Sequence, residues 1–477
     1  MSCAPKAGSP ERREENALDD PRDAATPPAE RLREGVRALM PELEAQLARL
    51  VAIPSISAPG FPEPTRAALL EAYEAVAGLF RDAGVERVEA FELPETAPIV
   101  TGEIPAPAGA PTVLLYSHYD VVAAGDESAW DSPPFAATTR EGALYGRGAA
   151  DTKSNILVHV GALRAWEGRP PVGVKLLIEG QEEVGSALET PANLGRFAAD
   201  ALLIADGGNI RPGVPSLTVG LRGDAVVTVE TRTLGSPKHS GQFGGAAPDA
   251  LIALLRALAT LHDEHGDVAV AGLRRDEWTG AAWTDDEFRQ LAEVEPGIPF
   301  VGTGPVADRV WSGPAITVTG IDVPSVDEAV NAVSAFARAK LNVRVHPEQS
   351  ASEAQAFVMR HLEEVRPFGI PLAVHAGDTG DGFAAPLGGP AYEAAQVAFR
   401  AAWGADLQRI ATGGSIPLVK ALNEVAPEAE ILLYGTTDGF ANIHGPNERV
   451  LVDEFEKAVL AEALLFAEYA ARAGGAG

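Results

Sequence analysis

Two adjacent carboxylates, Glu182 and Glu183, follow an apolar segment, LLIEG, that is typical of a buried strand. Like charges repel, and burying either carboxylate is costly unless a positive charge lies nearby. For the pair alone, the ordinary interpretation is a loop in which both side chains contact water. The other interpretation is that a cation binds here.

Other potential ligands follow apolar segments of the same kind. His118 and Asp120 come directly after PTVLLYS, Asp206 follows ALLIA, and His444 lies in the loop after EILLYG. Asp151 directly precedes a segment with helical periodicity. In an open α/β sheet, ligands bind beyond the carboxyl ends of the strands, so these distant residues could meet there. Each alone has an ordinary explanation as a packed, exposed or helix-capping side chain, but their joint occurrence favours a site.

Two histidines and several carboxylates offer nitrogen and oxygen ligands, a set that suits two divalent ions such as zinc, manganese or cobalt. In paired-metal sites the ions lie roughly 3.5–4 Å apart, share a carboxylate and a water, acidify that water and polarise a substrate carbonyl. One carboxylate must stay free to accept the proton. The doublet therefore predicts one glutamate that binds metal and one that acts as the base.

The segments that precede these residues predict an α/β fold. Apolar strands are expected at 111–117, 172–180, 201–207 and 430–439, and helices at 30–51, 65–82 and 154–166. Their alternation predicts a mostly parallel sheet that is flanked by helices.

The middle of the chain has a different pattern. Half-exposed antiparallel strands are expected at 224–234, 315–323 and 335–345, and helices at 248–261 and 353–365. We therefore expect an α+β domain of residues 221–383 that is inserted into a catalytic domain of residues 30–220 and 384–477. Residues 1–29 are rich in Pro, Ala and mixed charge, which predicts a disordered leader.

Composition narrows the class of protein. The formal net charge of −29 argues against nucleic acid or an anionic membrane as a partner, because both require basic patches. The single cysteine, Cys3, cannot form an internal disulfide, which fits a reducing compartment. The sequence has no apolar signal region and no apolar run long enough to span a bilayer, so we expect a cytoplasmic location.

Several segments between about residues 110 and 450 together resemble metallopeptidase family 20 (M20). This family includes carnosinase-like cytosolic dipeptidases, glutamate carboxypeptidases, acetylornithine deacetylase and succinyl-diaminopimelate desuccinylase. The matching segments are SHYDVV, AWDSPPFAATTREGALYGRGAADTKSN, IEGQEEVGS, ADGG, KHSGQFGG, VRVHP, GGSIPLV and NIHGPNE. The resemblance implies a di-metal catalytic domain with an inserted lid domain that also forms a homodimer.

The resemblance also implies which residues bind each ion, most commonly zinc. It assigns His118, Asp206 and a bridging Asp151 to one metal. It assigns the same Asp151, Glu183 and His444 to the other.

The remaining roles implied by the resemblance concern catalysis and substrate binding. Glu182 is the general base and acid, and Asp120 orients His118. His239 reaches the partner subunit's site and stabilises the oxyanion, and Arg344 binds the terminal carboxylate of the substrate. The resemblance also implies further substrate contacts, which are made by Gly414, Ser415, Ile416 and Asn331.

These assignments predict a hydrolase that cleaves dipeptides or short peptides with a free C-terminal carboxylate, using a metal-bridging hydroxide and Glu182. The long insert favours this activity over the alternative, an N-acyl-amino-acid deacylase. A binding protein without activity would be expected to lack Glu182 or a metal ligand, and all of them are present. The sequence departs from the family at Ser154, where glycine usually follows the lysine, and at Gly445, where dipeptidases commonly have serine or alanine.

Overall fold

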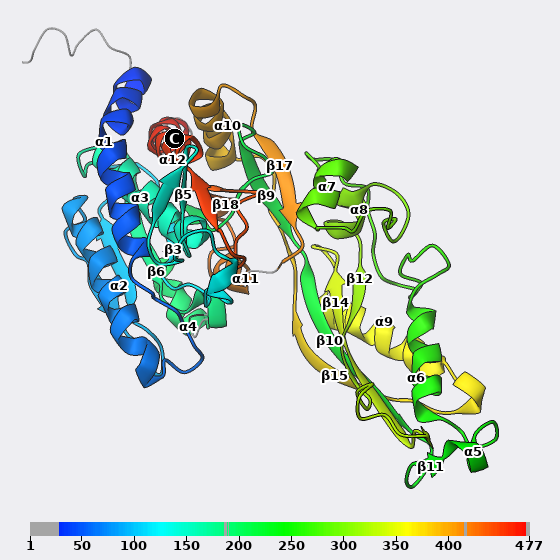
Figure 1. Cartoon of the computed structure of the whole chain (residues 1–477). Helices are drawn as coiled ribbons and strands as arrows, with labels where there is room; N and C mark the ends of the chain where they lie inside the picture. Colours follow the sequence, from blue (N-terminus) through cyan, green and yellow to red (C-terminus); the bar gives the residue numbers. More distant parts are fainter. Residues whose placement is uncertain (1–27, 186–187, 189, 415–416, 474–477) are drawn as a thin grey trace, which may run out of the picture.

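The computed structural model describes residues 28–185, 188, 190–414 and 417–473. The predicted leader lies outside these ranges except for its last two residues, which begin helix α1 (Pro28–Val51). Figure 1 shows a larger body, which contains the first and last parts of the chain, and an elongated body formed by its middle part. No helix within the described ranges is both long and apolar enough to cross a bilayer.

A nine-stranded mixed sheet forms the centre of the larger body. The path of neighbouring strands is β1-β2-β6-β3-β7-β18-β9-β16, and β17 also pairs with β9. Strands β6, β3, β7 and β18 are mutually parallel. Strands β2 and β9 pair antiparallel with β6 and β18 on the two sides, and β1 and β16 pair antiparallel with β2 and β9. The strands are β1 (Glu89–Phe91), β2 (Ile99–Ile104), β3 (Thr112–His118), β6 (Gly173–Glu179), β7 (Ala201–Ala205), β9 (Ser216–Leu221), β16 (Phe383–Ala384), β17 (Gln408–Thr412) and β18 (Glu430–Tyr434).

Helices cover both faces of this sheet, which explains why its central strands are apolar throughout. Val113 and Leu115 of β3 pack into one core, and Leu114 and Tyr116 pack into another on the opposite face. The first core contains side chains of α1, α2 (Glu63–Asp82), α3 (Ser154–Ala165), α10 (Pro390–Trp403) and α12 (Val452–Ala473). The second contains side chains of α4 (Pro191–Leu194) and α11 (Pro417–Val425). The predicted α/β fold is therefore confirmed.

The elongated body contains a second sheet, which is antiparallel and has the order β12-β14-β10-β15. Its strands are β10 (Gly223–Arg232), β12 (Ala315–Asp322), β14 (Phe336–Val345) and β15 (Ala373–Gly380). Helices α6 (Ala250–Leu258) and α9 (Ala351–Glu364) pack against its apolar face. Strand β15 was not predicted. At the far tip lie β11 (Lys238–His239), α5 (Ser240–Phe243) and β13 (Ala332–Val333) (Figure 1).

One segment of the predicted insert packs on the larger body. It carries α7 (Asp285–Leu291) and α8 (Val306–Val310). The Arg211 guanidinium contacts both oxygens of Glu287 at 2.7 and 2.8 Å, and Ala281 N donates to Arg409 O at 2.8 Å. Trp311 joins Ile210 in a small shared core. The insert thus touches the larger body through more than its two chain crossings.

Two smaller sheets also belong to the larger body. Strands β4 (Thr138–Arg140), β5 (Ala143–Tyr145) and β20 (Arg449–Leu451) form one small sheet, and β8 (Gly208–Asn209) pairs with β19 (Thr437–Asp438). The pairing of β5 with β20 holds the turn at residues 146–153 beside the loop that precedes β20.

A buried carboxylate shapes that turn. Glu448 accepts hydrogen bonds from the backbone N–H groups of Gly148, Ala150 and Asp151 at 2.9, 2.9 and 3.0 Å. Its other buried partner is Arg147, whose Nη1 lies 2.7 Å away. A side chain far along the chain therefore fixes the backbone that presents Asp151.

We expect Glu448→Gln to lower the free energy of unfolding by about 3–5 kcal/mol, because it leaves buried Arg147 without its counter-ion. The NH₂ group of the introduced glutamine would also face backbone N–H groups, and two donors cannot form a hydrogen bond with each other. Asp406→Asn is the control, since its ion pair with Arg400 is exposed and such pairs contribute at most about 1 kcal/mol. Urea denaturation measures the free energy of unfolding of both variants. A decrease below about 1 kcal/mol for the Glu448 variant would contradict the proposed role of Glu448 in holding the turn.

Candidate metal centre

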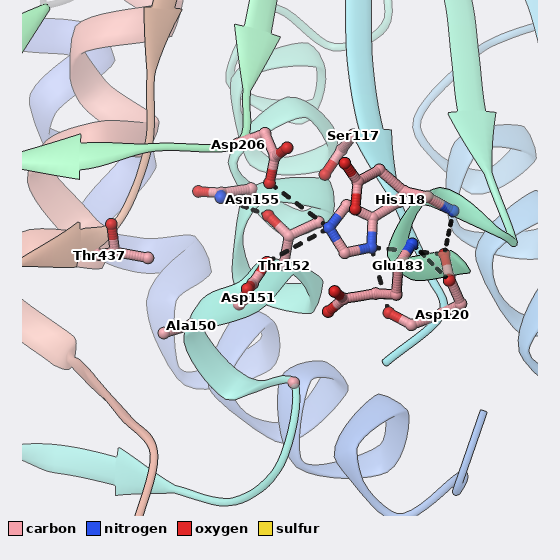
Figure 2. Close-up of polar contacts among 12 residues, drawn as sticks. Ser117, His118, Asp120, Ala150, Asp151, Thr152, Asn155, Glu183, Asp206 and Thr437 are labelled. Atoms are coloured by element: carbon pink, nitrogen blue, oxygen red, sulfur yellow. Dashed lines mark hydrogen bonds and ion pairs between the residues drawn. The ribbon is translucent and has the colours of Figure 1, made fainter. Parts of the chain in front are cut away.

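The predicted ligands converge at the carboxyl edge of the larger sheet, and Figure 2 shows four of them, namely His118, Asp151, Glu183 and Asp206. His118 is the last residue of β3, and Asp206 directly follows β7. Asp151 lies in the turn before α3, and Glu183 lies in a short 3-10 helix (Glu182–Val184) after β6. His444 comes from the loop after β19, where its backbone adopts a left-handed conformation with φ of 62°.

These five side chains form two groups that share Asp151. In the first, His118 Nε2 lies 3.2 Å from Asp151 Oδ1 and 3.4 Å from Asp206 Oδ1. In the second, His444 Nε2 lies 3.1 Å from Asp151 Oδ2 and 3.0 Å from Glu183 Oε2. One candidate ligand atom from each member lies within 4.8 Å of the others in its group. The two oxygens of Asp151 thus face different groups, as a bridging carboxylate requires.

The electrostatics of the cluster show that the protein alone does not balance its negative charge. Burial, together with the charge of Asp206, raises the pKa of Glu182 to about 8. Burial also raises the pKa of Glu183. Hydrogen bonds with Asp151 and Glu183 raise the pKa of His444 to about 10. Cations at the two groups would offset this excess negative charge, so the residues present fit a pair of divalent ions.

Asp120 connects the first group to the glutamate doublet. Its Oδ1 lies 3.4 Å from His118 Nδ1, and its backbone oxygen lies 3.1 Å from the same nitrogen. The two carboxylate oxygens of this fully buried residue accept hydrogen bonds from the backbone N–H groups of Glu182 and Glu183, each at 3.1 Å. Asp120 therefore orients the His118 ring and holds both glutamates in place.

Glu182 lies beside both groups but belongs to neither. Among the residues that the structure describes, no group donates a hydrogen bond to its carboxylate, whereas Glu183 contacts His444. The geometry therefore distinguishes two glutamates that are adjacent in sequence.

A cavity of about 400 Å³ opens next to Asp206. The insert contributes Trp283 and Trp311 to its wall, and the larger body contributes Ile410 and Thr412. The candidate centre therefore adjoins a space that both bodies enclose.

Other predicted site residues do not join the cluster within one chain. His239 and Asn331 lie at the far tip of the elongated body, where Ser240 N donates to Asn331 O at 2.9 Å (Figure 1). Arg344 lies near the end of β14 and forms a 3.4 Å ion pair with Asp224. Gly414 is exposed just after β17, and its predicted neighbours Ser415 and Ile416 lie outside the described residues.

Sequence reasoning missed two features of this region. It assigned no role to Glu448, although NIHGPNE contains it, and it missed Lys153, whose fully buried Nζ donates to Leu50 O and Ile53 O at 2.8 Å. Burial lowers the pKa of Lys153 to about 7. Both are charged residues with polar neighbours in the sequence (Asn447 and Arg449, and Thr152 and Ser154), so no local pattern indicates that they are buried or identifies their distant partners.

A third group of potential ligands, Asp276, His346 and Glu348, lies elsewhere. The Arg274 guanidinium lies 2.7 Å from Asp276 and 2.9 Å from Glu348. This group therefore already has its counter-charge.

Comparisons with known proteins agree with the fold and with the chemistry of the cluster. A Cysteinylglycine-S-conjugate dipeptidase of Corynebacterium striatum is 40% identical over 370 residues, which cover 76% of this chain and 81% of that protein. A Beta-Ala-His dipeptidase of Homo sapiens is 28% identical over 384 residues, 74% of each chain. The crystal structure of human carnosine dipeptidase 1 superposes with a TM-score of 0.75 at 26% identity, covering 94% of this chain and 99% of that one. Residues 114–468 match the family described as Peptidase family M20/M25/M40, and the chain belongs to that family.

Proposed function

We propose that this protein is a metal-dependent dipeptidase, which hydrolyses the amide bond of dipeptides or short peptides with a free C-terminal carboxylate. The observation that carries the proposal is the pair of ligand groups that share Asp151, together with Glu182, which belongs to neither group but is near enough for the charges of Asp206, His118 and Glu183 to act on it. A hydrolytic site needs this division between groups that hold cations and a group that carries a proton.

The relatives support dipeptides as the substrate class. The proteins from Corynebacterium striatum and Homo sapiens are both named as dipeptidases, although one name refers to Cys-Gly S-conjugates and the other to Beta-Ala-His. Their shared feature is a two-residue substrate rather than a particular side chain. This favours the dipeptidase over the N-acyl-amino-acid deacylase.

The proposed centre holds two divalent ions, with zinc as the first choice and manganese or cobalt as alternatives. His118, Asp151 and Asp206 would hold one ion, and Asp151, Glu183 and His444 would hold the other. When bound, such ions acidify a water and polarise the carbonyl of the scissile amide.

The remaining chemistry belongs to side chains of the protein. Glu182 accepts a proton from the attacking water and delivers it to the leaving amine, because its carboxylate is near the cluster and accepts no competing hydrogen bond from the described residues. Asp120 holds the Glu182 backbone and the His118 ring, so it acts by positioning. Arg344 binds the substrate carboxylate through its guanidinium.

The adjacent glutamates provide a matched pair of variants. We expect Glu182→Gln to keep its bound metal and to lose about 10²–10⁴-fold in kcat, since only proton transfer is removed. Glu183→Gln should instead lose metal, because it removes a proposed ligand. Elemental analysis and dipeptide hydrolysis are measured on both proteins. Substantial hydrolysis by the Glu182 variant, or equal loss of metal from both, would refute the assignment.

We also propose a homodimer that forms through the inserted domain. His239 and Asn331 lie at the tip, away from the metal centre of their own chain, so a role in catalysis requires a second subunit. β12 is an edge strand of its sheet, and Val318 and Ile321 on it are exposed. On α6, Ile252 and Leu255 are exposed as well. An exposed edge strand beside exposed apolar side chains is typical of an interface.

Subunit mixing tests the shared site. Glu182→Gln and His239→Ala should each be nearly inactive as homodimers. A coexpressed mixture should recover about a quarter of wild-type activity, because half of the dimers are mixed and each mixed dimer has one intact site. Activity equal to the average of the two separate variants would show that His239 does not act on a neighbouring subunit.

We also propose a cytoplasmic location and the absence of nucleic-acid and membrane partners. They rest on the single cysteine and the net charge of −29.

A further inference from the structure

A buried guanidinium at the junction of the two bodies lacks a counter-charge. Arg222 connects β9 to β10 and is 8% exposed. Within the described part of the chain, no carboxylate forms an ion pair with it, and its Nε has no hydrogen-bond partner. Its Nη1 reaches the backbone oxygens of Arg309 and Gly313 only at 3.4 Å, beyond the usual range for such bonds. A buried charge in this state is costly unless a ligand completes its surroundings.

Arg222 shares a face of the second sheet with Arg344. Asp224 lies opposite Arg344 in the β10–β14 register, and Arg222 precedes Asp224 by two residues, so their side chains point the same way. Asp224 is 3.4 Å from Arg344 Nη1 and also accepts a hydrogen bond from Asn342 at 2.5 Å. Burial, together with the charge of Arg344, lowers the pKa of Arg222 to about 10, so the Arg222 guanidinium stays charged at neutral pH. Asp224 thus pairs with Arg344, whereas Arg222 has no carboxylate partner among the described residues.

The backbone and the side chain of Arg222 both lie against the loop that follows β17. The backbone N–H of Arg222 donates to Thr412 O at 3.4 Å, and Thr412 lines the same cavity as Asp206. A Cβ on Gly413 would lie 2.8 Å from Arg222 Nη2, so glycine lets the loop lie directly against the guanidinium. Arg222 therefore lies against a loop that lines part of the cavity, and Arg344 is near enough for its charge to act on Arg222.

We propose that Arg222 and Arg344 together form the subsite for the C-terminal carboxylate of the substrate, with Arg222 as an additional specificity-determining residue. The inference rests on the proposed dipeptidase function. A bound carboxylate supplies the second negative charge beside Asp224, and two guanidinium groups can each donate to it. An uncharged C-terminal amide leaves one buried cation unbalanced, so the site discriminates against it.

The competing explanation is that Arg222 only supports the junction through the two carbonyl oxygens. Both explanations predict some loss of stability when Arg222 is replaced. Only the subsite predicts that replacing Arg222 lowers kcat/KM more for substrates with a free carboxylate than for their amides.

The test compares one dipeptide with its C-terminal amide, using metal-loaded wild-type protein and the variants Arg222→Gln, Arg222→Lys and Arg344→Gln. We expect the carboxylate-to-amide ratio of kcat/KM to fall about 10- to 100-fold in Arg222→Gln, mainly through KM, because a hydrogen bond to a charged group is lost. Arg222→Lys should retain part of the preference. Arg211→Gln is the control, since Arg211 is already paired with Glu287, and its ratio should equal that of wild type.

A second arm does not depend on turnover. Isothermal titration of the dipeptide and its amide into Glu182→Gln protein, with and without Arg222→Gln, measures the same discrimination in Kd. If Arg222→Gln fails to fold, Gly413→Ala displaces the guanidinium and should reduce the same ratio. The inference is overturned if Arg222→Gln weakens the binding of the dipeptide and of its amide equally, or if it leaves the carboxylate-to-amide ratio of kcat/KM unchanged. Failure of the wild type to hydrolyse any dipeptide overturns the proposed function instead, and the titration still decides the role of Arg222.

Discussion

Repulsion among carboxylates at one edge of the larger sheet is the constraint on which the rest of the structure depends. Asp151, Asp206, Glu182 and Glu183 lie around two imidazoles, and burial raises the pKa values of both glutamates. Such a cluster is stable only if cations balance it or if some members bind protons. The shared Asp151 faces both groups, which makes a pair of divalent ions the simplest way to balance the charge.

The scaffold maintains this costly arrangement through buried polar contacts on every side. Glu448 fixes the turn that carries Asp151, and Asp120 fixes the backbone of both glutamates. Lys153 ties the start of α3 to the end of α1 through two carbonyl oxygens. Because these contacts join segments distant in sequence, the ligands are held by the whole larger body rather than by one loop.

The sequence allowed the ligands to be predicted where local patterns are strong. The apolar strands β3 and β7 are recognisable, and His118 and Asp206 follow them directly. The resemblance then assigned separate roles to the glutamates, which residue types alone left open. Strand β15 was missed because AVHAGDTG has little apolar alternation, and Arg222 was missed because no local pattern marks a buried arginine without a counter-ion. Long-range contacts decide such features, and a single sequence does not contain them in readable form.

The most direct test of the central claim is diffraction from crystals grown with zinc, recorded at the zinc absorption edge. The account predicts two anomalous peaks per chain, one on each side of the Asp151 carboxylate and roughly 3.5–4 Å apart. The absence of zinc from this position, or a peak only at Asp276, His346 and Glu348, would contradict it.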